Sequence, residues 1–194
     1  MADPGRLIIF SGPSGAGKST VTRKILSECP LPLRLSVSAT TRDARPGEKD
    51  GIEYHFLEEA EFLKLRDADE FLECKEVFGS NWYGTLRREV TDGVSEGIWV
   101  ILEIDVQGAV SVMEQPWLDP ISFFIHPGSP RELERRLRDR GTESEDAIKR
   151  RLETAANEME YLPRYQYEII NSSVDVAAAQ ICQILEDHKE NQAC

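Results

Sequence analysis

The chain has 194 residues, of which 40% are hydrophobic and 30% charged, and a formal net charge of −12; these values predict one globular domain and exclude a disordered or fibrous chain. No apolar stretch approaches the roughly 18 residues of a membrane span, the start does not match a secretory signal, and the acidic excess argues against binding of long nucleic acid. The cysteines are widely spaced without a CxxC pair, which argues against zinc and against a disulfide framework and is typical of a cytoplasmic protein: Cys29, Cys74, Cys182 and Cys194.

Short apolar runs and helical periods alternate through most of the chain. Leu7–Phe10 is a continuous apolar run before Ser11-Gly12, which is typical of a strand buried on both faces, and residues 17–28 have a helical period. We expect further strands at residues 33–38, 98–102, 121–125 and 167–171, and further helices at residues 86–92, 106–114, 130–140, 144–160 and 174–189. Strands separated by helices predict an α/β fold with a doubly wound parallel sheet.

A segment after residue 38 departs from this alternation. It begins with an Arg- and Gly-rich loop, Thr40–Gly51, and continues with short strands around one helix. We expect the helix at residues 58–66 and the strands at residues 54–56, 71–77 and 82–83. The pattern predicts a small α+β lobe inserted into the main fold.

A phosphate-binding motif follows the first expected strand. The run Gly12-Pro13-Ser14-Gly15-Ala16-Gly17-Lys18-Ser19, followed by Thr20, fits GxxxxGK[ST] in full. Glycines let successive backbone N–H groups turn toward phosphate oxygens, and the next helix directs its positive dipole end to the same place. Lys18 brings a positive charge to the outer phosphates, and the Ser19 hydroxyl can ligate Mg²⁺. The motif predicts a nucleotide site.

Two classes of protein with this motif must be separated. A GTPase switch would add DxxG, present here as Asp105-Val-Gln-Gly108, and NKxD for guanine, which occurs nowhere in the sequence. A kinase for a small substrate needs a second anion site instead, and Arg42, Arg45 and Tyr54 offer one. Two guanidinium groups and a phenol can hold a monoester phosphate through bidentate hydrogen bonds. The alternative is that these arginines are ordinary solvated surface, but beside an intact phosphate motif they favour a kinase.

Beyond these motifs the sequence resembles the guanylate kinase family, in order from about Leu7 to Asn171. The resemblance rests on Ser36-Val-Ser38-Ala-Thr-Thr-Arg42-Asp-Ala-Arg45-Pro-Gly47-Glu48, Gly51-Ile-Glu-Tyr54-His-Phe56, Phe71-Leu-Glu73, Trp82-Tyr83-Gly84-Thr85, Ile101-Leu-Glu103-Ile-Asp105-Val-Gln107-Gly108 and Arg140-Gly-Thr142-Glu143. It implies Mg²⁺-dependent transfer of the γ-phosphoryl group of ATP to GMP, and also to dGMP, giving ADP and GDP. It further implies one domain, 1–194, with a core of residues 1–37, 98–129 and 153–194, a GMP-binding lobe of residues 38–97 and a lid of residues 130–152.

The resemblance also implies a role for each matching side chain. ATP lies on the phosphate motif from Gly12 to Thr20, and Asn171 is near its adenine end. The transferring phosphoryl group is held by Lys18, Arg136, Arg140 and Arg151. The GMP phosphate is held by Arg42, Arg45, Tyr54 and Tyr83, and the guanine base by Ser38, Glu73, Thr85 and Asp105.

The chemistry of guanine supports a carboxylate in the inserted lobe. Guanine presents N1–H and its 2-amino group side by side, two donors that one carboxylate accepts in parallel, whereas adenine offers neither. A site built on such paired hydrogen bonds rejects the wrong base by several kcal/mol. Glu73, which interrupts the apolar run after Phe71-Leu72, is the candidate, and a solvated carboxylate at a strand edge is the alternative.

The transfer needs no catalytic base, because the acceptor phosphate is already anionic and positioning with charge neutralisation does most of the work. We accordingly interpret the three histidines as structural. In the expected lid helix, Arg136 and Arg140 are four residues apart and share a face. A charged helix with interspersed Glu and Arg is more often a solvated surface, so this site depends on the family resemblance.

The sequence departs from the family pattern at a few positions. One extra residue, assigned to Ser80, lies between Glu73 and Tyr83; placed in a turn, it leaves both in register. Glu103 stands where an Asp is usual, which leaves its part near Mg²⁺ open. Cys74 follows Glu73 and is expected to point away from it, buried and unreactive.

Two alternatives remain to be weighed. A guanylate-kinase-like interaction module would hold phosphorylated peptides, but such modules typically have damaged phosphate motifs, and Lys18 and Ser19 are intact. A kinase with another acceptor, such as a ribosyl bisphosphate, would not need Glu73 or the complete segment 38–54. The sequence is compatible with a monomer and with a homo-oligomer.

Overall fold

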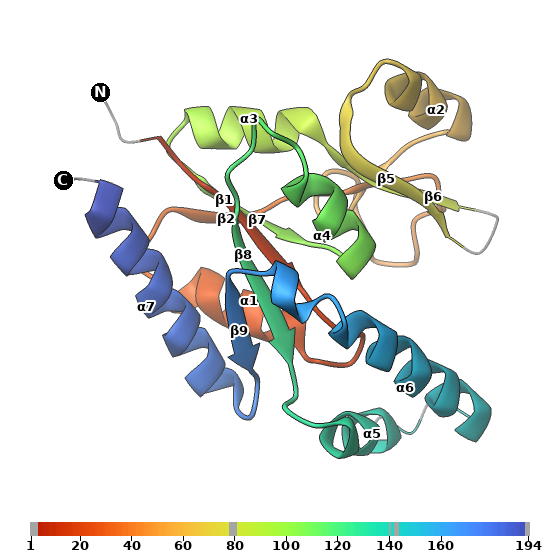
Figure 1. Cartoon of the computed structure of the whole chain (residues 1–194). Helices are drawn as coiled ribbons and strands as arrows, with labels where there is room; N and C mark the ends of the chain where they lie inside the picture. Colours follow the sequence, from red (N-terminus) through yellow and green to blue (C-terminus); the bar gives the residue numbers. More distant parts are fainter. Residues whose placement is uncertain (1–3, 78–80, 140, 142–143, 193–194) are drawn as a thin grey trace.

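The structure is a computed structural model that describes residues 4–77, 81–139, 141 and 144–192. Within these residues the central sheet has five parallel strands in the order β2-β7-β1-β8-β9, with helices on both faces (Figure 1). The predicted α/β fold with a doubly wound parallel sheet is confirmed. None of the described helices combines the length and the apolar character needed to cross a membrane.

The central sheet and its helices follow each other in the order that the apolar pattern predicts. The strands are β1 (Leu7–Ser11), β2 (Leu33–Leu35), β7 (Trp99–Glu103), β8 (Ile121–His126) and β9 (Tyr167–Ile170). The helices packed on the sheet are α1 (Lys18–Glu28), α3 (Arg87–Ser95), α4 (Val106–Met113) and α7 (Val174–Gln192). A short 3₁₀ turn, η1 (Leu162–Arg164), precedes β9.

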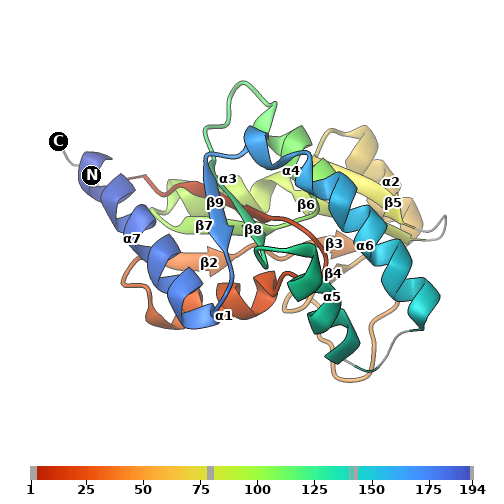
Figure 2. The same cartoon turned by 60° about the horizontal axis from the view of Figure 1, so that its bottom comes forward.

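Different helices cover the two faces of the sheet (Figure 2). Successive residues of β1 point to opposite faces: Ile8 and Phe10 pack in a cluster with α1 and α7, and Leu7 and Ile9 pack in a cluster with α3 and α4. All four side chains are buried. Because β1 is packed from both sides, the loop that leaves its carboxyl end starts from a rigid position.

A disulfide between Cys29 and Cys182 corrects the expectation drawn from the cysteine spacing. Cys29 is the C-cap of α1 and Cys182 lies on α7; their Cα atoms are 5.7 Å apart, and their sequence separation is 153. Packing of α1 against α7 brings the two thiols together, and no local motif announces this long-range contact.

The inserted lobe contains a second, mixed sheet, at the upper right of Figure 1. In the described residues its strand order is β4-β3-β6-β5, and its elements are β3 (Ala39–Thr40), β4 (His55–Phe56), α2 (Glu59–Asp67), β5 (Phe71–Val77) and β6 (Asn81–Leu86). The strand expected at residues 33–38 is confirmed only for its first half: β2 ends at Leu35, and Ser36 to Ser38 cross to β3 in the other sheet. The strand expected at residues 82–83 is longer in the structure: β6 spans Asn81–Leu86, because it pairs with β5 along its length.

The expected insertion at Ser80 falls outside the described residues. Val77 pairs with Asn81, and Lys75 and Glu73 pair with Tyr83 and Thr85 in the same hairpin. In the described residues, the pairing of β5 with β6 is regular from Glu73 to Val77.

Two helices form the part predicted as a lid, α5 (Pro130–Asp139) and α6 (Glu145–Met159). They pack on each other through a small apolar cluster of Leu133, Leu137, Ile148 and Ala155. The helix α6 begins at its N-cap Ser144, whose Oγ accepts a hydrogen bond from the backbone N–H of Ala147 at 3.3 Å.

Candidate active site

The phosphate motif forms the turn between β1 and α1, and we call Gly12–Ser19 the phosphate loop. Gly12, Gly15 and Gly17 have φ angles of 130°, 94° and 87°, which only glycine adopts without strain. Gly17 is the N-cap of α1 and offers no side chain to its first N–H groups, so these donors are available to an anion. A cavity of about 390 Å³ opens over the loop.

Lys18 is held by the carbonyl oxygens of its own loop. Its Nζ donates hydrogen bonds to the carbonyl oxygens of Gly12 at 2.7 Å and Pro13 at 3.2 Å. Burial lowers the pKa of Lys18, and the nearby carboxylates of Glu103, Glu158 and Asp105 oppose this. The ammonium group is therefore placed at the loop by neutral acceptors, with negative charge around it.

A pair of oxygen donors lies at the mouth of the loop. The Ser19 hydroxyl donates a hydrogen bond to Glu103, and the other oxygen of the same carboxylate accepts one from Thr22 Oγ1 at 3.0 Å. Mg²⁺ prefers hard oxygen ligands and is commonly bound by one or two protein groups plus substrate phosphates. The described residues hold no cluster of three or more His, Cys, Asp or Glu able to form a separate metal site. Ser19 and Glu103 instead offer the one or two protein oxygens that Mg²⁺ uses when substrate phosphates provide its other ligands.

The predicted lid arginines meet the phosphate loop from two helices. Arg136 on α5 donates to the carbonyl oxygens of Ala16 at 3.3 Å and Asn171 at 2.6 Å, and Arg151 on α6 donates to Ser14 Oγ at 2.6 Å. Arg140, which was expected to act beside Arg136, lies outside the described residues. Two of the three predicted lid cations are thus at the loop.

Asn171 lies beside the loop at the end of β9. Its side chain is 2% exposed, and its Nδ2 donates a hydrogen bond to the Ala16 carbonyl at 2.8 Å. A cavity of about 410 Å³ runs past it, lined also by Thr20 and Arg136. Asn171 therefore both supports the loop and borders a space next to it.

A bulge in β5 determines where Glu73 points. Phe71 pairs with Leu86 and Glu73 with Thr85, so the register shifts at the residue between them. Phe71 and Cys74 consequently share the apolar face of the lobe, and the Glu73 side chain lines a cavity on the other face. The prediction that Cys74 points away from Glu73 is confirmed; Cys74 is half-buried, and burial raises the pKa of its thiol.

We call this cavity the Glu73 pocket; it has a volume of about 270 Å³. Thr85 Oγ1 donates a hydrogen bond to Glu73 Oε1 at 2.7 Å. Burial raises the pKa of Glu73, the Thr85 hydrogen bond lowers it, and the charge of Asp105 raises it further. The pocket is lined by Ser38, Tyr54, Glu73, Lys75, Val77, Tyr83, Gly84, Glu103, Ile104 and Asp105.

Asp105 has a structural task as well as a place in the pocket. Its Oδ1 caps α4 by accepting the backbone N–H of Gly108 at 2.8 Å. Its Oδ2 lies 3.4 Å from the Nζ of Lys75, which also donates to Gln107 Oε1 at 2.7 Å. One oxygen of the Asp105 carboxylate is thus the N-cap acceptor of α4, and the other faces the ammonium group of Lys75 in the wall of the pocket.

The predicted phosphate-binding arginine Arg42 is engaged in a fork with Glu48. Its two terminal nitrogens lie 2.9 and 3.0 Å from the oxygens of Glu48, and its guanidinium lies 5.4 Å from the centre of the Tyr54 ring. Glu48 also accepts the backbone N–H of Arg45 at 2.7 Å. This carboxylate folds the 42–48 loop so that both arginines lie near Tyr54.

Sequence reasoning missed several groups of the site. Glu103 was left open and proves to contact Ser19, and Lys75, Glu48 and Glu158 were not singled out at all. The residues that Glu103 and Lys75 contact are distant in sequence, and Glu48 lies in a loop without regular structure, so no local pattern indicated these contacts. The available signals were the position of Glu103 directly after the apolar run 98–102 and the single Glu of the Arg-rich loop, Glu48.

The histidines contact groups away from these cavities, as predicted. The Nε2 atoms of His55 and His126 lie 3.0 and 2.8 Å from the carboxylates of Glu89 and Glu168. His188 Nε2 lies 2.9 Å from the hydroxyl of Tyr167. None of these partners belongs to the phosphate loop or to the Glu73 pocket.

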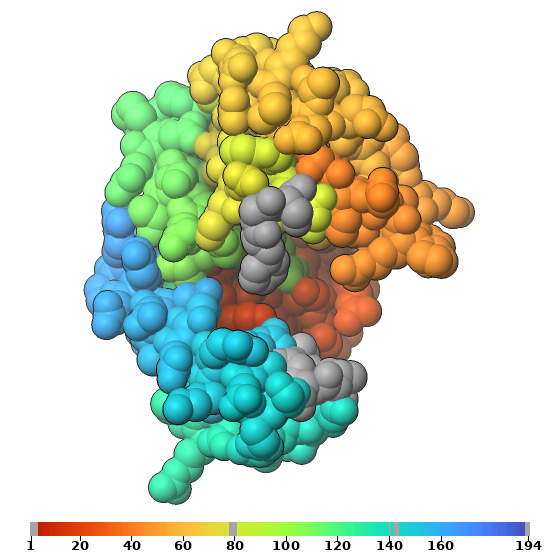
Figure 3. All heavy atoms as spheres, turned by 90° about the vertical axis from the view of Figure 1, so that its right-hand side faces the viewer, coloured from red at the N-terminus to blue at the C-terminus, as the bar shows by residue number. Residues whose placement is uncertain are grey.

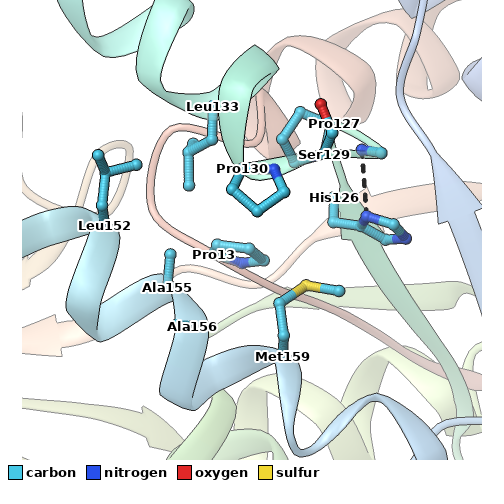
Figure 4. A pocket seen from close by; sticks show the side chains of 11 residues that line it. Pro13, His126, Pro127, Ser129, Pro130, Leu133, Leu152, Ala155, Ala156 and Met159 are labelled. Carbon is cyan, nitrogen blue, oxygen red and sulfur yellow. Dashed lines mark hydrogen bonds between the residues drawn. The ribbon is translucent and has the colours of Figure 1, made fainter.

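A further cavity, of about 380 Å³, lies between Pro13 of the phosphate loop, residues 126–130 and the two lid helices (Figure 4). Pro13 lies on one side and Leu152, Ala155 and Met159 of α6 lie on the other. The walls are almost entirely apolar. Apolar packing between α6 and the loop is therefore incomplete.

The phosphate loop and the Glu73 pocket open on the same hollow. Glu103 lines both the cavity over the loop and the Glu73 pocket, so the two spaces adjoin. In the space-filling view the hollow lies between the inserted lobe and the lid, with N-terminal residues at its floor (Figure 3).

Comparison with known proteins agrees with this arrangement. The family model described as "Guanylate kinase" matches residues 4–188. The guanylate kinase of Rhodopirellula baltica is 58% identical over 194 residues, which cover 100% of this chain and 93% of that protein. The guanylate kinase of Desulfitobacterium hafniense is 44% identical over 181 residues, which cover 93% of this chain and 89% of that protein. The crystal structure of guanylate kinase from Anaplasma phagocytophilum superposes with a TM-score of 0.75 at 37% identity, covering 97% of this chain and 88% of that chain.

Proposed function

The chain belongs to the guanylate kinase family, and from this premise we propose that its phosphate loop receives ATP and its Glu73 pocket receives GMP. The reaction of the family moves the γ-phosphoryl group of ATP to the phosphate of GMP and gives ADP and GDP. The chain is accordingly a nucleoside monophosphate kinase.

One observation carries the assignment of the two sites: Glu103 borders both cavities. A donor phosphate on the loop and an acceptor phosphate in the neighbouring pocket then meet above the same side chain. Direct transfer requires this adjacency, because the attacking and leaving oxygens must be roughly in line.

On the ATP side, the loop offers backbone N–H groups and Lys18. The ammonium group moves from the carbonyl oxygens of Gly12 and Pro13 to the outer phosphates, which replace neutral acceptors by charged ones. Arg136 and Arg151, already at Ala16 and Ser14, are within reach of the same phosphates. We assign the adenosine end to the cavity beside Asn171.

On the GMP side, the carboxylate of Glu73 accepts the two parallel donors of guanine. Thr85 fixes one of its oxygens, and the free edge of the carboxylate faces the pocket. Ser38 and Asp105 line the same pocket and provide further contacts to the base. A site of this kind accepts dGMP as well, since no residue assigned to the base depends on the 2′-hydroxyl.

The acceptor phosphate binds Arg42, Arg45, Tyr54 and Tyr83. Glu48 holds Arg42 and the backbone of Arg45 in place, so the phosphate joins a loop that is already folded. The acceptor oxygen carries its own negative charge, and no side chain has to remove a proton. The cations of the loop and the lid stabilise the charge of the transferring group.

Mg²⁺ fits the hydroxyl of Ser19, with Glu103 beside it. When bound, Mg²⁺ neutralises charge on the ATP phosphates and orients them. The chain itself contributes the position of these two oxygen groups, and Thr22 keeps the Glu103 carboxylate turned toward Ser19.

We propose the division into a core, a GMP-binding lobe of residues 38–97 and a lid of residues 130–152. Closure of lobe and lid over both substrates would exclude water, which would otherwise accept the phosphoryl group of ATP. The deciding experiment is an ADP-release assay with GMP, dGMP, AMP, CMP and UMP as acceptors. We expect turnover with GMP and dGMP and little with the others; equal turnover with AMP would contradict the assignment.

A further inference from the structure

The guanidinium group of Arg136 divides its nitrogens between two kinds of partner. Its terminal nitrogens Nη1 and Nη2 donate to the carbonyl oxygens of Ala16 at 3.3 Å and Asn171 at 2.6 Å. Its Nε donates to Glu132 Oε1 at 2.8 Å, within the same helix α5. Because the guanidinium group is planar and rigid, the hydrogen bond at Nε restricts the directions in which both terminal nitrogens can point.

The partners of the terminal nitrogens belong to the site proposed for ATP, whereas Glu132 does not. Ala16 is part of the phosphate loop, and Asn171 lines the cavity beside it. Glu132 lies in the first turn of α5, where its backbone N–H donates to Ser129 Oγ at 3.2 Å, and it lines neither this cavity nor the one over the loop. When phosphate oxygens take up the terminal N–H groups, the ion pair with Glu132 is therefore the contact that stays in place.

Glu132 is itself held by a second arginine, Arg135. The Nε and Nη2 atoms of Arg135 donate to the two oxygens of the Glu132 carboxylate at 2.9 and 2.7 Å. The hydrogen bonds from Arg135 and Arg136 lower the pKa of Glu132 to about 2, so the carboxylate is charged at neutral pH. The side chain of Arg135 is 61% exposed and that of Arg136 20% exposed. Arg135 thus fixes the carboxylate from the solvent side, and the carboxylate fixes Arg136.

A neighbouring ion pair on α5 has the same spacing without the same surroundings. Glu134 Oε1 accepts a hydrogen bond from Arg138 Nη2 at 2.9 Å, again four residues apart. The other carboxylate bound to Arg138 is that of Glu145, at the start of α6. Such pairs on a helix surface are common and contribute little to stability. What distinguishes Glu132 is that its partner Arg136 also contacts the phosphate loop.

We propose that Glu132 is a positioning residue for phosphoryl transfer: it anchors Arg136 through Nε, so that the terminal nitrogens face the phosphates bound at the loop. The proposal rests on the proposed function of the loop as the ATP site and of Arg136 as a cation for the transferring phosphoryl group. The acceptor oxygen that Glu132 offers to Nε is the essential feature, and the ion pair with Arg135 is not.

The test compares two Glu132 variants in the ADP-release assay with saturating ATP and GMP. Glu132→Met keeps the length of the side chain and removes the acceptor; we expect it to lower kcat by about 10- to 100-fold, the range for misplaced catalytic groups, with the KM for GMP unchanged. Glu132→Gln keeps one acceptor oxygen, and it is made together with Arg135→Met so that this oxygen is not shared. We expect the Gln variant and Arg135→Met alone to have kcat close to wild type.

The matched control is Glu134→Met, which removes the neighbouring ion pair of the same helix and should leave kcat unchanged. A double-mutant cycle then separates positioning of Arg136 from a general effect on the fold. In the Arg136→Met background, measured in single turnovers with excess enzyme, Glu132→Met should cause no further loss. Melting temperatures verify folding, and Glu132→Ala, which also lacks the acceptor, replaces Glu132→Met if that variant does not fold.

Several outcomes would each overturn the proposal. They are wild-type kcat in Glu132→Met or in Arg136→Met, a loss in the Gln variant as large as in the Met variant, an equal loss in Glu134→Met, and additive losses of Glu132→Met and Arg136→Met. Absence of GMP phosphorylation by the wild-type protein would instead overturn the proposed function.

Discussion

Glu73→Gln tests the recognition of guanine with little change of shape. The amide keeps one oxygen for the Thr85 hydroxyl and turns an NH₂ group toward the base. One of the two guanine donors then faces another donor and loses its acceptor. A hydrogen bond to a charged group contributes about 1.5–3 kcal/mol, and about 1.4 kcal/mol corresponds to a tenfold change. We therefore expect kcat/KM for GMP to fall by about 10- to 150-fold.

The same substitution should not weaken the fold. Burial raises the pKa of Glu73 in the folded protein, so its charged form is disfavoured there relative to the unfolded chain. At neutral pH the carboxylate consequently costs stability, and a neutral amide of the same size removes that cost. We expect the melting temperature of Glu73→Gln to equal or exceed that of the wild type.

The assay measures kcat/KM for GMP and AMP in Glu73→Gln, wild type and the control Glu76→Gln. Glu76 lies on the same strand with an exposed side chain, so its variant should retain the wild-type preference. The ratio of GMP to AMP should fall in Glu73→Gln alone. An unchanged ratio would show that the base is recognised elsewhere and would refute the reasoning.

Three further predictions follow from the site and the disulfide. The KM for GMP should rise as the pH falls through the raised pKa of Glu73, because the protonated group no longer accepts both donors; the same titration of Glu73→Gln, which should lack this component, controls for the ionisation of GMP. Lys18→Met should lower kcat by about 10²- to 10³-fold, as loss of one charge-stabilising group does. The control Lys24→Met, on the same helix, should leave kcat unchanged. A near wild-type kcat in Lys18→Met would contradict the role of Lys18. Cys29→Ser should lower the free energy of unfolding by about 2–4 kcal/mol without reductant, and denaturant titrations in reducing buffer should show the difference from wild type disappear; a difference that persists under reduction would assign the effect to packing rather than to the bond with Cys182.

The phosphate loop could be predicted from the sequence because its determinants are contiguous. Gly12, Gly15 and Gly17 allow the positive φ angles of the turn, and Lys18 begins the helix that the motif requires. The strands of the central sheet were predictable for a similar reason, since a strand buried on both faces is a continuous apolar run. Local chemistry determines both features.

Other parts of the site depend on contacts that no local pattern records. The bulge between Phe71 and Glu73 reverses the faces of β5, so simple alternation of side chains does not show which way Glu73 points. The contact of Glu103 with Ser19 joins the end of β7 to the first turn of α1, and the bond between Cys29 and Cys182 joins two helices. These pairs become visible only when the topology is known.

The binding of two anionic nucleotides by a chain of net charge −12 depends on how its cations are held. Exposed charges are screened over about 8 Å at physiological ionic strength, so the acidic surface acts weakly on the floor of the hollow. There, Lys18 is held by the carbonyl oxygens of Gly12 and Pro13. Arg136 also donates to two carbonyl oxygens, but its Nε forms an ion pair with Glu132 at 2.8 Å.

A cation that leaves a neutral carbonyl for a phosphate abandons no charge, so the whole of the new ion pair contributes to binding. Arg42 differs, because departure from Glu48 would leave a carboxylate beside the incoming phosphate. We therefore expect the acceptor phosphate to bind Arg42 while the Arg42–Glu48 ion pair stays intact, rather than to displace Glu48. Lys18 is thus the mobile cation on the side of the hollow proposed for ATP, and Arg42 is a fixed cation on the side proposed for GMP.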